Sequence, residues 1–443
     1  MATLPRKTAV NILLNIEKNG AYTNIEMNKL RTYAHYDQKD IRLIGEIVNG
    51  VIKRKLTLDY IISIHSSTKL KKISPYVLNV LRTGAYQLLF MDKIPPSAAV
   101  DESVKLVKKS SASFLSGFVN AVLRSIDKSD LDKLPCDKYE MLSIKYSYPL
   151  WLVKRWADEF GFDFAISLME SLNKKPNLYI RCNTLVNSIS EFEQKLINEN
   201  IDYSKVVLDN FKDFNYSFYI KGIKDLSRIP GFNDGAFYIQ DPMAALSAYL
   251  LNPKGAQRVI DLCAAPGGKS LFIADLMSDK GEIISCDIFE HKLKLIKENA
   301  DKHFAKSIVP TLNDAGILRE EWINTADRVL CDVPCSGFGI IRKKSDIKYT
   351  HTPKDFSSLA KLSLKILSNA AKYLKKDGIL VFSTCTIEKE ENEDVVNEFL
   401  KTHSEFSMYP FGDNNAYSDG FFTSYPHLTD TDGFFIARLI KNR

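Results

Sequence analysis

Two cysteines in the second half of the chain follow apolar runs that are typical of buried strands. Asp332-Val333-Pro334-Cys335 closes the run that begins at Arg328, and Ser383-Thr384-Cys385 closes the run that begins at Ile379. Open α/β sheets bind ligands beyond the carboxyl ends of their strands, so both thiols are expected at that edge. A thiolate is a strong nucleophile, and a neighbouring carboxylate can hold a proton. These residues predict covalent chemistry by a cysteine, assisted by Asp332.

A loop of small residues follows an earlier strand-like run, Val259 to Leu262, and leads into a helix expected from Ser270 to Met277. Small residues let a ligand approach the backbone closely. Asp287 ends the next expected strand, 19 residues after Gly268, where a carboxylate is placed to accept ribose hydroxyl groups. Asp314 follows the third strand and could bind an adenine amino group. This pattern predicts an adenosine ligand.

The loop is not G-x-G-x-x-G, and it places Pro266 where a dinucleotide site would use a helix amide to bind pyrophosphate. An adenosine ligand without phosphates is therefore favoured over NAD, and S-adenosylmethionine fits. The residues expected to bind it are Cys263, Ala264, Ala265, Pro266, Gly267, Gly268, Lys269, Asp287, Asp314 and Asp332.

Two thiols and an acid beside a methyl donor fit one reaction well. Carbon 5 of cytosine is not nucleophilic until a group adds to carbon 6, and a thiolate can make that addition. Asp332 would hold the ring nitrogen in protonated form, carbon 5 would take the methyl group, and loss of its proton would expel the cysteine. The sequence chemistry leaves open whether Cys335 or Cys385 attacks.

The other cysteines do not extend this site. Cys286 and Cys331 lie inside expected strands, where a cysteine is usually a small buried hydrophobic residue. Cys136 and Cys182 lack any motif and are likewise expected to be small buried residues. The spacing of Cys331 and Cys335 could suggest zinc, but no second Cys/His pair completes a tetrahedral site, so no metal is expected.

The surrounding pattern predicts three domains. Residues 1–140 have helical apolar spacing and predict an all-helical bundle, with helices from Asp37, Ser74 and Pro95 and a further one at 111–126. Residues 141–235 predict a small α+β module, ferredoxin-like or RRM-like. Residues 236–443 alternate strands with helices, which predicts a Rossmann-like, doubly wound α/β domain. The expected strands are 178–182, 236–240, 258–262, 282–287, 308–312, 328–332 and 379–383, with a helix at 189–199.

Charge is uneven along the 443 residues. Residues 1–140 carry 22 Lys+Arg against 14 Asp+Glu, whereas the rest carries 38 against 40. A basic module beside a near-neutral one favours a polyanion partner for the first, although charge alone is also typical of a solvated surface. The 7 irregularly spaced cysteines predict reduced thiols, and no run is long enough to span a membrane. We therefore expect a soluble cytoplasmic protein, active as a monomer.

The motifs at 263–269, 332–337 and 384–385 together resemble those of the NOL1/NOP2/Sun family of RNA cytosine-5 methyltransferases. The resemblance covers nearly the whole chain. Further segments resemble the bacterial Sun/Fmu branch, the 16S rRNA methyltransferases. Its NusB-like RNA-binding domain is resembled by RTGAYQLLF (82–90) and GFVNAVLR (117–124), and its connecting module by YIRCNTL (179–185) and Gln240-Asp241. Its closing strand is resembled by Asp432-Gly433-Phe434-Phe435.

The resemblance implies S-adenosylmethionine as cofactor and a single-stranded or loop cytosine of 16S rRNA as substrate, customarily cytosine 967. It also implies that Cys385, in the Thr-Cys motif, is the nucleophile and that Cys335, in the Pro-Cys motif, assists release. DNA cytosine methyltransferases instead attack with the Pro-Cys cysteine. One departure is Arg342-Lys343-Lys344-Ser345-Asp346, where the family commonly has Arg-Arg-His-Pro-Asp. The basic charge is kept, and the lost proline is expected to alter the loop that grips RNA.

Three other functions compete with this one. A non-catalytic RNA-binding factor fits the basic bundle but not the complete set of thiols and acids. A dehydrogenase is disfavoured by the missing phosphate-binding glycines. A methyltransferase of tRNA or 23S rRNA is the nearest rival, and the NusB-like bundle favours 16S rRNA over it.

Overall fold

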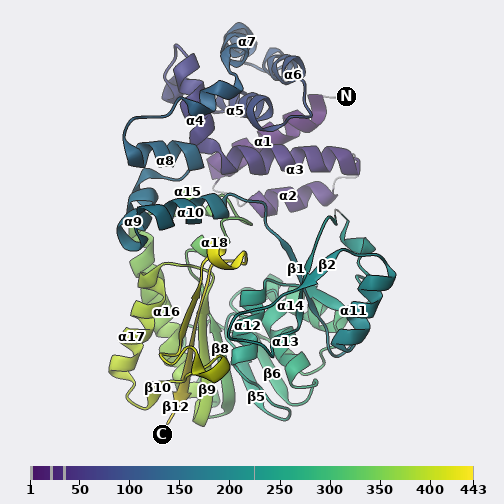
Figure 1. The fold of residues 1–443 in the computed structure, drawn as a ribbon, viewed down its shortest axis with the longest axis vertical. Helices are drawn as coiled ribbons and strands as arrows, with labels where there is room; N and C mark the ends of the chain where they lie inside the picture. Colours follow the sequence, from purple (N-terminus) through teal and green to yellow (C-terminus); the bar gives the residue numbers. More distant parts are fainter. Residues whose placement is uncertain (1–2, 20–22, 33–35, 224, 443) are drawn as a thin grey trace. The chain divides into compact units, whose positions relative to one another are not determined.

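The computed structural model describes residues 3–19, 23–32, 36–223 and 225–442. The chain forms two compact units, Met1–Lys174 with Ile341–His351, and Lys175–Ile340 with Thr352–Arg443. The first unit is helical, and the second contains both sheets (Figure 1). None of the described helices is long and apolar enough to cross a membrane.

The first unit begins with the helices that the apolar spacing predicts. Asp37 caps α3, its carboxylate accepting from the amides of Lys39 and Asp40, and Pro75 and Pro96 stand in the first turns of α5 and α6. The helix expected at 111–126 is shorter, because a 3-10 turn precedes α7. The bounds are α1 Thr3–Asn19, α2 Thr23–Thr32, α3 Gln38–Lys53, α4 Lys55–His65, α5 Pro75–Phe90, α6 Pro96–Lys108 and α7 Ser116–Ser125.

The first unit continues past residue 140, where the sequence suggested a domain boundary. Helices α8 (Lys138–Tyr146), α9 (Leu150–Phe160) and α10 (Phe162–Leu172) belong to it. Trp156 on α9 is fully buried, as is Tyr148 just before that helix. These large apolar side chains explain why the segment packs as helices rather than as the short mixed elements expected there.

A segment from the second half of the chain is built into the first unit. Residues 341–351, here called the strap, contain α15 (Ile347–Thr350) and join the first unit by their contacts. The Asp346 carboxylate accepts from the amide and hydroxyl of Thr23 at 3.0 and 2.9 Å, where α2 begins. Arg342 donates to the Ser171 carbonyl at 2.9 Å. Nothing in the sequence indicated this placement.

The second unit starts with a small antiparallel sheet in the order β2-β3-β1-β4. Its elements match the expected α+β module, with helix α11 opened by a capping box of Ser188 and Glu191. Buried aromatic and aliphatic residues from strands and helix, Phe192 and Phe218 among them, form its core. The bounds are β1 Leu178–Cys182, α11 Ile189–Asn198, β2 Tyr203–Lys205, β3 Ser217–Ile220 and β4 Phe237–Ile239.

The large sheet has the order β10-β12-β9-β8-β5-β6-β7, with β11 beside β12. Strands β5 to β9 run parallel to one another, β12 runs antiparallel to β9, and β10 and β11 each pair antiparallel with β12. The chain reverses its direction of winding at β5, where doubly wound folds form their ligand crevice. The bounds are β5 Arg258–Asp261, β6 Glu282–Asp287, β7 Ile308–Leu312, β8 Ala326–Asp332, β9 Leu374–Thr384, β10 Phe406–Met408, β11 Phe421–Ser424 and β12 Phe434–Lys441.

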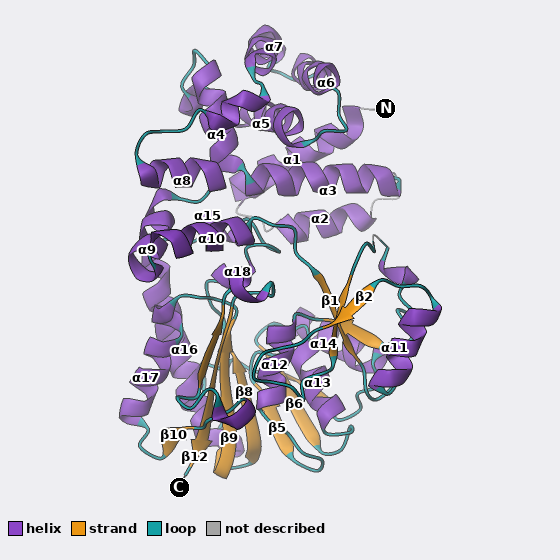
Figure 2. Ribbon diagram, in the orientation of Figure 1, coloured by secondary structure: helices purple, strands orange, loops and turns teal. Residues whose placement is uncertain are grey.

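Alternating side chains divide this sheet between two cores. Val259 and Ile283 face the helices α12, α13 and α14, whereas Ile260 and Ile284 face α16 and α17. Figure 2 shows these helices beside the strands. The doubly wound architecture predicted from the sequence is therefore confirmed. The helix bounds are α12 Pro242–Leu250, α13 Gly268–Leu276, α14 Glu290–Lys302, α16 Pro353–Tyr373, α17 Glu393–Thr402 and α18 Pro426–Thr429.

Candidate functional site

The two motif cysteines lie together at the carboxyl ends of neighbouring strands. Strands β8 and β9 pair in parallel with Asp332 opposite Ser383, so the loops that follow them leave the sheet side by side. The Sγ atoms of Cys335 and Cys385 are 3.4 Å apart, in hydrogen-bonding contact. The amide of Gly339 donates to the Cys385 carbonyl at 3.0 Å, which closes one loop onto the other.

Asp332 is bonded through both of its carboxylate oxygens. Ser383 donates its hydroxyl to Oδ1 at 2.9 Å, and the Lys269 ammonium lies 2.6 Å from Oδ2. Burial opposes the charge of Lys269, but the Asp332 carboxylate outweighs it and raises the Lys269 pKa, with help from Asp261 and Cys385. Lys269 was expected to bind cofactor, whereas here its ammonium holds the acid beside the thiols and places a positive charge near Cys385.

The small-residue loop has the shape of a cofactor cradle. It runs from β5 to α13, with Gly267 in a left-handed conformation at φ 105° that disfavours other residues. Ala264 donates its amide to the Cys286 carbonyl at 2.7 Å, and Asn299 donates to the Pro266 carbonyl at 2.8 Å. In the described chain no side chain caps α13, so its first amides are available to a ligand.

The acids expected to bind adenosine follow the neighbouring strands. Asp287 ends β6 and is buried; its Oδ1 accepts from the Phe289 amide at 3.0 Å, and its Oδ2 lies 3.6 Å from the Lys292 ammonium. Asp314 follows β7 and is exposed, accepting from the Gly316 amide at 2.8 Å. The structure thus places both at the same sheet edge as the loop.

Asn313 is a neighbouring residue that the sequence did not single out. Its backbone amide donates to the Asp287 carbonyl at 3.1 Å, and its side-chain oxygen accepts from Arg319 at 3.0 Å. Its buried amide nitrogen has no acceptor among the residues that the structure describes. Such a donor normally has a partner, and the ring nitrogens of adenine are acceptors. The residues present therefore fit an adenosine ligand.

A buried arginine of the small sheet supports the loop. Arg181 on β1 is 1% exposed; it pairs with Asp275 on α13 and donates to the Gln240 side chain at 2.8 Å and to the Gly268 carbonyl at 3.4 Å. Burial raises the Asp275 pKa to about 6, although Arg181 opposes that shift. Within the YIRCNTL segment, Arg181 thus positions the start of α13, a role that local sequence did not reveal.

Three of the four remaining cysteines lie where the sequence predicted. Cys182, Cys286 and Cys331 are buried, whereas Cys136 is exposed, so the expectation that it is a buried residue is wrong. Burial raises the pKa of Cys286 and Cys331 above the ordinary thiol range, which leaves them unreactive. Among the described residues, no group of three His, Cys, Asp or Glu side chains could hold a metal ion.

The basic loop that replaces Arg-Arg-His-Pro-Asp does not expose all of its charges. Arg342 is 5% exposed and Asp346 7% exposed, and both bond within the first unit. That this loop grips RNA stays a prediction, to which these two buried side chains do not contribute directly. They anchor the strap instead.

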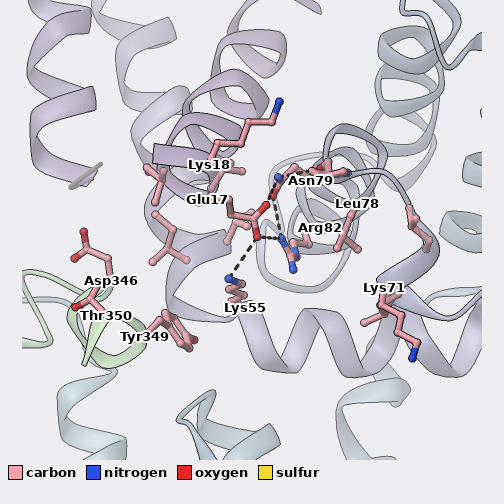
Figure 3. Close-up of a pocket in the computed structure, with 17 residues that line it drawn as sticks. Glu17, Lys18, Lys55, Lys71, Leu78, Asn79, Arg82, Asp346, Tyr349 and Thr350 are labelled. Atoms are coloured by element: carbon pink, nitrogen blue, oxygen red, sulfur yellow. Dashed lines mark hydrogen bonds and ion pairs between the residues drawn. The ribbon is translucent and has the colours of Figure 1, made fainter. Parts of the chain in front are cut away.

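The first unit contains a cavity of about 800 Å³ between α1, α3, α5 and the strap. Figure 3 shows Glu17 accepting from Asn79 and Arg82, at 2.7 and 2.6 Å, with Lys55 at 3.4 Å. Arg82 also forms a bidentate pair with Asp59. Because these ionic groups bond to one another, the cluster fastens α1 to α5, and the cavity does not point to a particular ligand.

Known proteins resemble this chain along its whole length. Residues 3–128 match the NusB family, 148–209 an RsmF/B-like ferredoxin-like domain and 248–440 the family described as 16S rRNA methyltransferase RsmB/F. A probable ribosomal RNA small subunit methyltransferase B of Bacillus subtilis is 36% identical and covers 99% of each chain. A ribosomal RNA small subunit methyltransferase B of Photorhabdus laumondii is 31% identical over 91% of each chain.

Solved structures share the fold. The protein PH0851 is 24% identical, with a TM-score of 0.80, and covers 98% of this chain and 99% of its own. NSun6 from Pyrococcus horikoshii, solved with SFG, is 23% identical with a TM-score of 0.57, and covers 67% of this chain and 99% of its own. The sequence matches over nearly the full length show that the chain belongs to the ribosomal RNA small subunit methyltransferase B family, the Sun/Fmu type of 16S rRNA methyltransferases.

Proposed function

We propose that the protein transfers a methyl group from S-adenosylmethionine to carbon 5 of a cytosine in 16S rRNA, through a covalent bond between Cys385 and the base. The observation that carries this proposal is the pair of thiols 3.4 Å apart beside the Asp332 and Lys269 ion pair. The family name supports the rRNA substrate. The family's customary target, cytosine 967, is the site we propose.

The proposed cofactor site is the cradle at 263–269, with Asp287, Asn313 and Asp314 toward the adenosine end. S-adenosylmethionine supplies an electrophilic methyl group when bound there. The chain's own groups orient it: the α13 amides and the Asp287 carboxylate offer a donor set and an acceptor at one sheet edge. Asp332, next to both the loop and the thiols, faces the place where the two substrates would meet.

The charges around the two sulfurs favour Cys385 as the nucleophile. Lys269 places a positive charge near Cys385, as its own pKa records. The hydrogen bond with Cys385 and burial raise the Cys335 pKa well above its usual range, and the negative charges of Glu391 and Asp332 act in the same direction. Cys335 therefore keeps its proton, and a protonated thiol does not attack.

Cys385 and Asp332 act on carbon 6 and on the ring nitrogen in the proposed reaction. The Cys385 thiolate bonds to carbon 6, and the electron pair of the 5,6 double bond moves to carbon 5, which takes the methyl group. The methyl–sulfur bond of S-adenosylmethionine would break at this point, and its electron pair would stay on that sulfur. Asp332 accepts the hydrogen bond of the protonated ring nitrogen meanwhile. Carbon 5 then loses its proton to solvent, the double bond re-forms, and the pair of the carbon–sulfur bond returns to Cys385. The base must first leave its stack, which costs less in a loop.

The test uses RNA that carries 5-fluorocytosine, which cannot lose a proton from carbon 5. Wild type should form a slowly migrating RNA adduct in denaturing electrophoresis, only with S-adenosylmethionine, and Cys385→Ala should form none. With ordinary RNA, Cys335→Ala should accumulate an adduct because release is impaired. An adduct in Cys385→Ala that is lost in Cys335→Ala would reverse the two roles. Adduct formation that neither substitution abolishes would mean that neither cysteine is the nucleophile.

The position of the target needs a separate experiment. Bisulfite sequencing of rRNA from cells with and without the gene reads 5-methylcytosine directly. Loss of the signal at cytosine 967 of 16S rRNA alone is expected. Loss at a tRNA or 23S rRNA position instead would support the rival substrate.

A further inference from the structure

A buried acid lies directly behind the two thiol loops. Glu391 ends the short 3-10 turn Lys389–Glu391 between β9 and α17, and its side chain is 0% exposed. Its Oε2 accepts the backbone amide of Ser336, the residue after Cys335, at 2.8 Å. Glu391 thus binds the Cys335 loop from the side of the protein interior.

The next residue binds the other loop. Asn392 accepts from the Thr384 hydroxyl at 2.6 Å and donates to the Thr386 carbonyl at 3.2 Å, on either side of Cys385. The hydroxyl groups of Ser336 and Thr386 join the two loops at 2.8 Å. Consecutive residues, Glu391 and Asn392, therefore hold one thiol loop each, and the distance between the sulfurs depends on both.

A carboxylate is a costly way to hold a single amide. Its second oxygen, Oε1, is buried and has no hydrogen-bond partner within the described chain. Burial raises the Glu391 pKa to about 7, a shift that the Ser336 bonds oppose and the nearby Glu388 and Glu390 reinforce. A neutral side chain would bind the amide without this desolvation. Burying this acid is costly, and the loop that it binds carries the Cys335 thiol, on which Glu391 acts electrostatically when it is ionised.

We propose that Glu391 is a positioning residue for the release step, holding Cys335 as a neutral thiol against Cys385. This rests on the proposed function. As the carbon–sulfur bond breaks, its electron pair returns to Cys385, and the Cys335 S–H donates a hydrogen bond to that sulfur and stabilises it. The carbon 5 proton goes to solvent, so no further reactant is needed. Glu391 acts through the Ser336 amide and through its charge, and it does not touch the base.

The experiment compares Glu391→Gln and Glu391→Ala with Glu398→Gln, a matched change at a half-exposed site on α17. Glutamine can still accept from Ser336 but lacks the charge, whereas alanine loses both. Turnover on ordinary RNA should fall about 10-fold in Glu391→Gln, the difference between a hydrogen bond to a charged acceptor and one to a neutral acceptor, and further in Glu391→Ala, which loses the bond. Adduct should then accumulate on ordinary RNA, and Glu398→Gln should behave as wild type.

Formation of the 5-fluorocytosine adduct distinguishes a specific defect in the release step from a general loss of active-site structure. Because attack by Cys385 does not need Glu391, both variants should form this adduct at the wild-type rate. If adduct formation falls in proportion to turnover, or if turnover is unchanged, the proposal is wrong. Glu391→Gln decides the matter if Glu391→Ala does not fold. No adduct in wild type itself would instead refute the covalent mechanism, which keeps the two failures distinct.

Discussion

The two thiols at the sheet edge are influenced by the charged side chains around them. Lys269 bonds to Asp332 at 2.6 Å, and Glu391 binds the amide that follows Cys335 at 2.8 Å, so oppositely charged groups lie near the two sulfurs. Two chemically identical thiols can then take different roles because one is surrounded by negative charge and the other lies near a cation.

At the residue scale, we predict that Asp287→Ala weakens S-adenosylmethionine binding by roughly 10-fold or more, the usual effect of losing hydrogen bonds to a carboxylate. RNA affinity should stay nearly unchanged, because the proposed role of Asp287 is toward ribose. Calorimetry with each ligand measures both. Asp301→Ala is the control, since Asp301 is an exposed acid on α14 paired only with Lys297 in the described ion pairs. A folded Asp287 variant with wild-type cofactor affinity would exclude this residue from the site.

A second residue-scale prediction concerns pH and Glu391. The Glu391 pKa rises from 4.5 to about 7 on folding, chiefly through burial. The native state therefore binds more protons than the unfolded state between these values, and wild-type stability should fall as pH rises from about 4.5 to 7. Glu391→Gln removes that contribution, up to about 3 kcal/mol at 1.36 kcal/mol per pKa unit.

Urea unfolding across this pH range measures the difference between wild type and Glu391→Gln. Taking the difference matters because Asp261 and Asp275, with pKa values raised by burial to about 7 and about 6, act in the same direction in both proteins. Parallel stability curves for the two proteins would show that Glu391 titrates normally.

At the scale of elements, the thiol loops depend on a close approach of two backbones. Gly339 donates its amide to Cys385 and accepts from Gly433, just before β12, at 3.0 and 2.9 Å. A side chain at Gly339 would place its Cβ 1.9 Å from the Gly433 carbonyl oxygen. The Cys335 loop thus packs directly against the closing Asp-Gly-Phe-Phe segment.

We therefore predict that Gly339→Ala lowers stability by about 1–3 kcal/mol, the range for forced overpacking, and lowers methylation with it. Gly117→Ala on α7 is the matched control: its Cβ would meet nothing within 4 Å, so helix propensity should leave it neutral or slightly stabilised. Thermal unfolding and turnover measure both effects. Equal melting temperatures for the two variants would mean that the loop adjusts freely.

At the scale of the whole molecule, the strap comes from the second half of the chain but packs within the first unit, so its folding depends on that unit. Lys348 is fully buried, donates to the Lys53 carbonyl at 2.9 Å and lies 4.3 Å from the centre of the Tyr148 ring. Burial lowers its pKa well below the usual lysine range. Without α3 and α2, this lysine would lose its acceptor, the Lys53 carbonyl, and Asp346 would lose its donors on Thr23.

We predict that deleting residues 1–140 exposes the strap rather than simply removing an RNA-binding module. Hydrogen exchange at 341–351 should become fast in the truncated protein, because exchange reports the free energy of local opening. Exchange at β5 and β6 serves as the internal control and should stay slow. A strap that remains protected would show that it does not need the first unit.

The basic charge of the first unit is better tested without truncation. Replacing the exposed Lys69, Lys71 and Lys72 with glutamine should weaken RNA binding and flatten its salt dependence, by about one unit of slope for each phosphate that is no longer neutralised. The control changes Lys372, Lys375 and Lys376, which are exposed and lie next to or at the start of β9. The start of this strand is at the opposite edge of the sheet from the thiols. Equal salt slopes for both triple variants would mean that the first unit's charge only solvates its surface.

The sequence by itself determined the main parallel strands and the residues that meet at the thiol edge. Strands β1, β6 and β7 have the predicted bounds, and the thiols and Asp332 lie at the carboxyl edge of the sheet as their motifs indicated. This succeeded because alternating apolar runs fix a strand, and the residues just after parallel strands must meet at one edge.

Tertiary structure alone decided which charged residues are inside. The run Glu388 to Glu393 is typical of a solvated surface, yet Glu388 and Glu391 are 0% exposed, and the basic strap contains a fully buried Lys348. The ammonium of Lys269, a residue that its motif assigned to the cofactor, bonds to Asp332. Burial and ion pairing depend on segments up to hundreds of residues away, such as Lys53 and Lys348, and local periodicity carries no information about contacts at that separation.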